Sequence, residues 1–272
     1  MFDYLKKRSF DNDKRGQVTI FIILAVLVVA GIVLLIVLTG DSDDSQGISG
    51  DQGIQGPSAF LESCSEREIF SYLRDLRLQG GYLNPQSKIN SSRVDGINRD
   101  VAYLCYSNTL DKECTPQQGA LVGHMERQLE NASERVIEDC FSNMINSYEE
   151  KGYEVSGGSF NAEDDMSVDL VPGRYVINLN YSSITLEKTN ETINLESGSE
   201  LVYSSELYEL GQVANYLVRE ESKYRNYRPE QFASFYASYE VIRNETLKTS
   251  EIYTISKFDS DREFRFGIRE LN

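Results

Sequence analysis

The stretch VTIFIILAVLVVAGIVLLIVL, residues 18–38, decides how this chain is organised. It contains no charged residue, and as an α-helix its 21 residues would be about 31 Å long. That length is enough to cross the hydrocarbon core of a bilayer, which is roughly 30 Å thick. Five basic residues precede it within residues 1–17, and an acidic stretch follows it. Because positive charge is retained on the cytoplasmic side, we expect the N-terminus inside the cell and the rest of the chain outside.

A cleaved secretory signal is the alternative to a retained span. Such signals also begin with basic residues, but their apolar run is about 7 to 15 residues long and ends at a small-residue cleavage site. The run here is longer, and its end at residues 34–38, LLIVL, offers no site of that kind. The sequence therefore favours a single retained span at 18–38 behind a basic head at 1–17.

The composition changes twice after the span. Residues 39–57 are rich in glycine, serine and aspartate and have no periodic apolar positions, which predicts a flexible acidic linker. Residues 58–272 have the mixed composition of a folded domain. The whole chain has a formal charge of −16; the basic head contributes +2, so the part outside the cell carries −18. Such a surface repels phosphate backbones, so we expect no nucleic-acid partner.

The external part has helical segments. Four segments carry apolar residues at the 3.6-residue period of an amphipathic helix: about 59–79, 120–151, 205–225 and 229–243. Gly80 and Gly152 supply stop signals after the first two. We expect these two helices to pack together.

Two regions alternate between apolar and polar residues and predict strands: about 153–196 and 251–270. Breaks at 157–158, 172–173 and 189–190 predict an antiparallel meander in the first region, and the final hairpin is expected to close its sheet. The predicted fold class is an N-terminal transmembrane helix followed by an extracytoplasmic α+β domain with an antiparallel sheet and disulfides.

Four cysteines lie in the external part, and an even number outside the cytoplasm favours disulfides over free thiols. Cys64 and Cys140 fall on the apolar stripes of the first two helices, whereas Cys105 and Cys114 flank a short polar loop. We therefore pair Cys64 with Cys140 and Cys105 with Cys114. The sequence leaves the two other connectivities open. We expect no metal site, because the cysteines lack zinc-ligand spacing and the chain has a single histidine.

No residue pattern predicts catalysis. His124 lies on a predicted helix and is expected to be an ordinary surface residue. The acidic residues 163–165 are expected to form a solvated hairpin tip between two strands. We expect no catalytic residue, no cofactor and no enzymatic activity; an extracytoplasmic enzyme of unknown class is the third functional possibility.

Aromatic residues are abundant, with 17 tyrosines and no tryptophan. Several gather near the C-terminus: Tyr224, Tyr227, Phe232, Phe235, Tyr236 and Tyr239. Their helical spacing favours a place in the core, and a protein- or glycan-binding patch is the alternative.

Five Asn-x-Ser/Thr sequons are possible glycosylation sites, and all lie in the external part: Asn90, Asn131, Asn180, Asn190 and Asn244. They agree with an exported surface.

The residues Lys14-Arg15-Gly16-Gln17, which lead straight into the apolar helix, resemble the class III signal peptide of archaeal type IV pilin-like proteins. This resemblance implies that a prepilin peptidase cuts between Gly16 and Gln17 and that the mature helix can assemble into filaments. The chain departs from the pilin pattern because Phe21 stands where many pilins carry Glu.

A second likeness begins with Glu62-Ser63-Cys64 and continues with Gln79-Gly80-Gly81-Tyr82. These residues are similar to those of uncharacterised single-pass envelope proteins from small-genome archaea. The resemblance implies an archaeal envelope protein and no particular activity.

Together these features predict a single-pass, membrane-anchored cell-surface protein with a non-catalytic binding or assembly ectodomain. Its expected partners are the lipid bilayer, through residues 18–38, and other envelope or cell-surface proteins. A type IV pilin-like filament subunit is the alternative.

Overall fold

The structure is a computed structural model that describes residues 56–90, 99–224, 227–247 and 249–271. All of them belong to one compact unit, Gly53–Asn272. The expected head, the span at 18–38, the processing site at Gly16 and Gln17, and nearly all of the linker lie outside these residues. Within the described ranges no helix is both long enough and apolar enough to cross a membrane.

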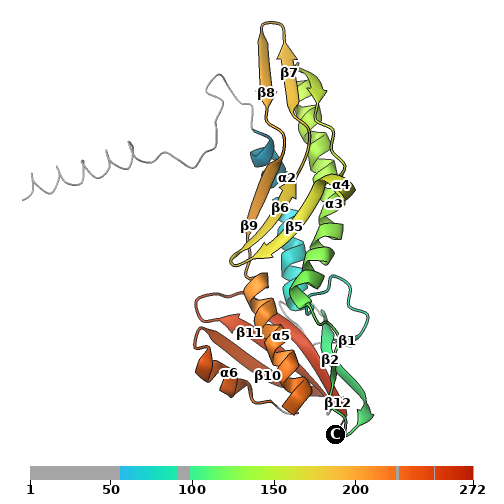
Figure 1. The fold of residues 1–272 in the computed structure, drawn as a ribbon, viewed down its shortest axis with the longest axis vertical. Coiled ribbons are helices and arrows are strands. Elements are labelled where there is room, and N and C mark those ends of the chain that lie inside the picture. Colours follow the sequence, from blue (N-terminus) through green and yellow to red (C-terminus); the bar gives the residue numbers. More distant parts are fainter. Residues whose placement is uncertain (1–55, 91–98, 225–226, 248, 272) are drawn as a thin grey trace, which may run out of the picture. The chain divides into compact units, whose positions relative to one another are not determined.

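The described residues contain three long helices and two short ones, whose arrangement is drawn in Figure 1. They are α2 (Pro57–Leu78), α3 (Leu121–Glu150), α4 (Ala162–Asp165), α5 (Leu207–Tyr224) and α6 (Pro229–Phe235). The first two pack side by side, as the sequence predicted. Helix α2 stops where the chain enters Gly80 and Gly81 at positive φ angles, and the Gly81 N–H donates a 2.8 Å bond to the Leu76 carbonyl. Glycine adopts this conformation at little cost, so it ends the helix.

The buried stripe of α2 differs from the expected one by one position. Its inner face carries Leu61, Ser65 and Ile69, whereas Cys64 is exposed. Residues four positions apart lie on the same face of a helix, so Ser65 faces the core together with Leu61. The buried Ser65 hydroxyl is satisfied there, because it donates to the Leu61 carbonyl and lies 2.8 Å from the Tyr203 hydroxyl oxygen.

The largest sheet has six strands in the order β1-β2-β12-β11-β10, with β3 paired to β2. The strands are β1 (Lys88–Asn90), β2 (Asp100–Leu110), β3 (Thr115–Pro116), β10 (Tyr239–Leu247), β11 (Ser250–Lys257) and β12 (Glu263–Leu271). Neighbours run antiparallel except β12 and β2, which are parallel. Helix α5 packs on this sheet, and its buried Leu210 and Leu217 belong to the same apolar core as Phe266 of β12.

Two three-stranded antiparallel sheets form the middle of the chain. One contains β5 (Met166–Val171), β6 (Arg174–Leu179) and β9 (Ser199–Ser204); the other contains β4 (Glu154–Gly157), β7 (Ile184–Lys188) and β8 (Glu191–Leu195). The single meander predicted for 153–196 is therefore wrong. Two-residue turns at 172–173 and 189–190 join β5 to β6 and β7 to β8, but the chain changes sheet between these hairpins. The alternation of residues identifies strands, whereas their partners depend on contacts distant in sequence.

Three further differences from the sequence-based expectations concern the strands. The final hairpin, β11 and β12, does not close the sheets of residues 153–196; it pairs with β10 and β2 instead. The predicted helix at 229–243 ends at Phe235, and strand β10 begins at Tyr239. The sequence did not indicate β2, because its residues 101–105 are all buried and show no alternation.

Both disulfides are present with the expected partners. Cys64–Cys140 joins α2 to α3 across 76 positions, and Cys105–Cys114 joins β2 to the segment before β3 across 9. The described domain is therefore an α+β fold, rich in antiparallel pairs, with two covalent cross-links.

Candidate binding cleft

The aromatic cluster predicted near the C-terminus has a buried interior. Phe232 on α6 is 3% exposed, and its ring centroid lies 4.7 Å from that of Tyr236, 5.5 Å from Tyr216 and 6.3 Å from Tyr239. These contacts attach the short helix α6 to α5 and to strand β10. The core interpretation of the sequence therefore holds for Phe232.

The outer part of the same cluster is open to solvent. Tyr224 is 66% exposed, Phe235 82% and Tyr236 52%. Exposed aromatic side chains that gather in one place mark interaction surfaces more often than isolated ones do. The alternative interpretation of the sequence, a binding patch, describes these three residues better.

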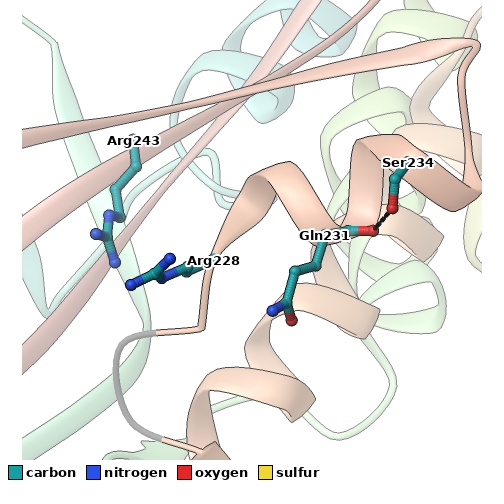
Figure 2. A pocket seen from close by; sticks show the side chains of 4 residues that line it. All are labelled: Arg228, Gln231, Ser234 and Arg243. Atoms are coloured by element: carbon teal, nitrogen blue, oxygen red, sulfur yellow. Dashed lines mark hydrogen bonds between the residues drawn. The ribbon is translucent and has the colours of Figure 1, made fainter.

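Two adjoining pockets lie beside this cluster. A basic pocket of about 430 Å³ is lined by Arg228, Gln231, Ser234 and Arg243 (Figure 2). An aromatic pocket of about 470 Å³ is lined by Tyr216, Glu220, Tyr224, Tyr227, Arg228, Gln231 and Phe235. Arg228 and Gln231 line both pockets, so the two form one continuous surface, which we call the α6 cleft.

A buried carboxylate holds the backbone of one of the residues that line the cleft. Glu221 on α5 is 2% exposed, and it accepts hydrogen bonds from the Tyr253 hydroxyl and, at 3.2 Å, from the Tyr227 backbone N–H. The Arg243 Nη1 donates to the Tyr227 carbonyl at 3.4 Å. The backbone of Tyr227 is thus held on both sides, which fixes the chain as it enters α6. A buried carboxylate needs such partners to offset its lost hydration.

Arg243 keeps its charge in this setting. Burial acts to lower the pKa of its guanidinium, but the hydrogen bond with Tyr253 and the charges of Glu251 and Glu221 outweigh burial and raise that pKa. The phenol of Tyr227 stays neutral, because burial first and its hydrogen bond with Tyr216 second raise its pKa to about 12. The cleft therefore contains a guanidinium group that stays charged and a phenol group that stays neutral.

His124 is not the surface residue that the sequence predicted. Only 9% of it is exposed, and its ring centroid lies 4.3 Å from that of Tyr82. The turn after α2 covers the start of α3, which the periodicity of α3 alone does not reveal. Its Nε2 atom has no hydrogen-bond partner among the described residues. Burial, and then the charge of Arg127, lower the pKa of His124, so the ring is neutral at neutral pH.

The acidic residues 163–165 form the one-turn helix α4 between β4 and β5, which belong to different sheets, so they are not a hairpin tip. Glu163 and Asp164 are exposed, as expected. Asp164 and Asp165 accept hydrogen bonds from the side chain and backbone of Asn161 at 2.9 Å and 3.0 Å. Among the described residues, no three His, Cys, Asp or Glu side chains are grouped so that they could hold a metal ion.

Four of the predicted glycosylation residues carry exposed side chains: Asn131, Asn180, Asn190 and Asn244. Asn90 lies in β1. These four asparagines lie on different elements from those of the α6 cleft, except Asn244 on β10, and Ser133 of the Asn131 sequon is buried.

The sequence did not indicate Arg228, Gln231 and Arg243 as binding residues. The predicted helix through 243 gave Arg243 the wrong neighbours, because strand β10 places it on the same face as Tyr239 and Val241. The cleft offers cationic, hydrogen-bonding and aromatic groups, a combination suited to binding.

Compared with known protein families, with curated proteins and with solved structures, the chain matches none of them.

Proposed function

We propose that this chain is a single-pass membrane protein of the cell surface whose external domain binds a ligand through the α6 cleft. The observation that carries the proposal is the exposed aromatic rim of Tyr224, Phe235 and Tyr236 next to the two arginines of the basic pocket. Exposing three large rings is unfavourable in water unless something covers them.

Several features support the place of this domain outside the cell. The uncharged run at residues 18–38 is preceded by basic residues, an arrangement that retains the N-terminus in the cytoplasm. All four cysteines are joined in disulfides, which persist in oxidising compartments and are rare in the cytosol. The binding role is preferred over an enzymatic one, because the described residues of the cleft include no acid–base pair next to a nucleophile.

Binding to isolated envelope material tests this function. Full-length protein in nanodiscs of zwitterionic lipid is mixed with envelope fragments from the source cells, and the bound fraction is measured after sedimentation. We expect a joint Tyr224→Ala and Phe235→Ala variant to lose binding, because these rings are 66% and 82% exposed and form the rim. Phe258→Ala is a matched control, since Phe258 is 70% exposed and lines neither pocket. Equal binding by all three proteins would refute a role for the cleft.

A pilin-like filament subunit is the second candidate, favoured by the residues Arg15-Gly16-Gln17 before the apolar run. It predicts a native N-terminus at Gln17 and recovery of the processed protein in sheared extracellular filaments. We expect processing at Gln17 with the protein still bound to membranes, because Phe21 replaces the Glu of many pilins. N-terminal sequencing of membrane and filament fractions distinguishes the two candidates, and an intact Met1 start removes the second.

A further inference from the structure

The basic pocket brings two positive charges together. Figure 2 shows the guanidinium groups of Arg228, the residue just before α6, and Arg243 on β10 pointing toward one another. Arg243 forms an ion pair with Glu251 at 3.7 Å. Among the ion pairs between described residues, none involves Arg228. Like charges held close together repel each other, so this arrangement is relieved when an anion lies between them.

The geometry of the two side chains suits an oxyanion. A guanidinium presents parallel N–H groups that match the two oxygens of a carboxylate or sulfate. Arg243 is fixed in place by its bonds to the Tyr227 carbonyl and to Glu251, whereas Arg228 is exposed and able to close on a ligand. None of the described side chains that line this pocket is acidic. The pocket is therefore a local basic site on a chain with a formal charge of −16.

Neutral polar groups lie next to the arginines. The Ser234 hydroxyl donates a 2.8 Å hydrogen bond to the Gln231 carbonyl, so its oxygen can still accept a hydrogen bond from a ligand (Figure 2). The Gln231 side-chain amide lines both pockets and offers two donors and an acceptor. Such groups suit a ligand that carries several hydroxyls.

The aromatic pocket begins where the basic pocket ends. Tyr224 and Phe235 line it with exposed aromatic side chains, and Arg228 and Gln231 connect them to the basic pocket. A ligand that fills both pockets needs an anionic group, hydroxyls and an apolar face. A sugar ring with a carboxylate or sulfate has all three. An inorganic anion would use the arginines alone, and an acidic peptide would supply carboxylates without the hydroxyl-bearing ring.

We propose that the α6 cleft binds an acidic carbohydrate, with its carboxylate or sulfate between Arg228 and Arg243 and a sugar ring against Tyr224 and Phe235. This inference rests on the proposed function, because it names the ligand class of the same site. It places the ligand among the acidic polymers that occur at cell surfaces.

A panel of oligosaccharides tests the inference on the full-length protein in nanodiscs of zwitterionic lipid. Binding by isothermal titration is compared for an oligouronate, a sulfated oligosaccharide, a neutral oligosaccharide of equal length and an oligoglutamate. We expect at least one acidic oligosaccharide to bind, and the Arg228→Ala variant to weaken that binding about tenfold or more, the size expected for losing a charge-assisted contact. Arg135→Ala is the control, since the Arg135 side chain is 91% exposed on α3 and lines neither pocket.

The outcomes separate the possible sources of the anion. Binding of the oligouronate or of the sulfated oligosaccharide identifies which group occupies the basic pocket. Equal affinity for the neutral oligosaccharide, tighter binding of oligoglutamate, or full binding by Arg228→Ala would overturn the inference. Thermal unfolding of each variant shows whether it is folded. If envelope fragments still bind through Phe235 while every sugar fails, the ligand class is wrong and the proposed function stands; if envelope fragments do not bind, the function itself falls.

Discussion

Opening the Cys64–Cys140 disulfide should destabilise the domain more than opening Cys105–Cys114. In the loop-entropy model a cross-link stabilises by restricting the unfolded chain, and the effect grows with the length of the closed loop. A separation of 76 positions corresponds to about 4.5 kcal/mol, and a separation of 9 to about 2.5 kcal/mol. In a domain of this size, about 1 kcal/mol shifts the midpoint of thermal unfolding by about 2–4 °C. The longer cross-link should therefore raise that midpoint by roughly 9–18 °C.

Reduction provides the cleanest perturbation, because it opens a disulfide without removing a side chain. Residues 53–272 are produced with the pair Cys105→Ala and Cys114→Ala, so that a reductant opens only Cys64–Cys140. The reciprocal variant, with Cys64→Ala and Cys140→Ala, isolates the short cross-link. Each is unfolded by urea with and without reductant, and tyrosine fluorescence reports the transition because the chain has no tryptophan. A loss for the long cross-link that equals or falls below that of the short one would refute the loop-entropy argument.

Three other outcomes test individual contacts. Burial lowers the pKa of His124, so the unfolded chain binds the proton more readily than the folded chain. The free energy of unfolding should therefore fall as the pH drops below about 6.5 and level off below the folded pKa. This pH-dependent part should be absent from His124→Phe when the unfolding of the two proteins is compared from pH 7.5 to 5. Ser65→Ala should lower the free energy of unfolding by about 1–3 kcal/mol, because it leaves the buried Tyr203 hydroxyl without its partner at 2.8 Å. In a Tyr203→Phe background the same substitution should cost much less, as measured by urea unfolding. In urea unfolding, Gly81→Ala should destabilise the domain more than Gly173→Ala. Both glycines have positive φ, but a new Cβ would meet side chains at 2.9 Å and 3.1 Å at Gly81 and nothing within 4 Å at Gly173. Equal losses of stability would contradict this packing.

The sequence allowed much of the fold to be predicted where the signal is local. Helices α2, α3 and α5 lie within two residues of their expected bounds, because their apolar residues repeat over many turns and glycines follow the first two. The hairpins at 172–173 and 189–190 are set by turn residues. Strand β2 was not predicted, because residues on both of its faces are buried and show no alternation. Strand β10 was not predicted, because Phe232, Tyr236 and Tyr239 are spaced as on one face of a helix.

The site was predictable only in part. The aromatic residues near the C-terminus were visible as a cluster, but the division between the buried Phe232 and the exposed Phe235 depends on how α6 packs on Tyr216. The two arginines of the cleft come from different elements, so their approach could not be inferred without the strand assignment of β10. Burial of His124 depends likewise on Tyr82, which lies far from it in the sequence.

Lysine labelling of intact cells shows whether the domain faces the outside of the cell. Cells are treated with an amine-reactive biotin reagent that does not cross membranes, and labelled lysines are identified by mass spectrometry before and after permeabilisation. We expect Lys112 and Lys223, whose side chains are exposed, to be labelled on intact cells, whereas the lysines of any unprocessed head at residues 1–17 should react only after permeabilisation. Protection of Lys112 and Lys223 until the membrane is opened would contradict this expectation.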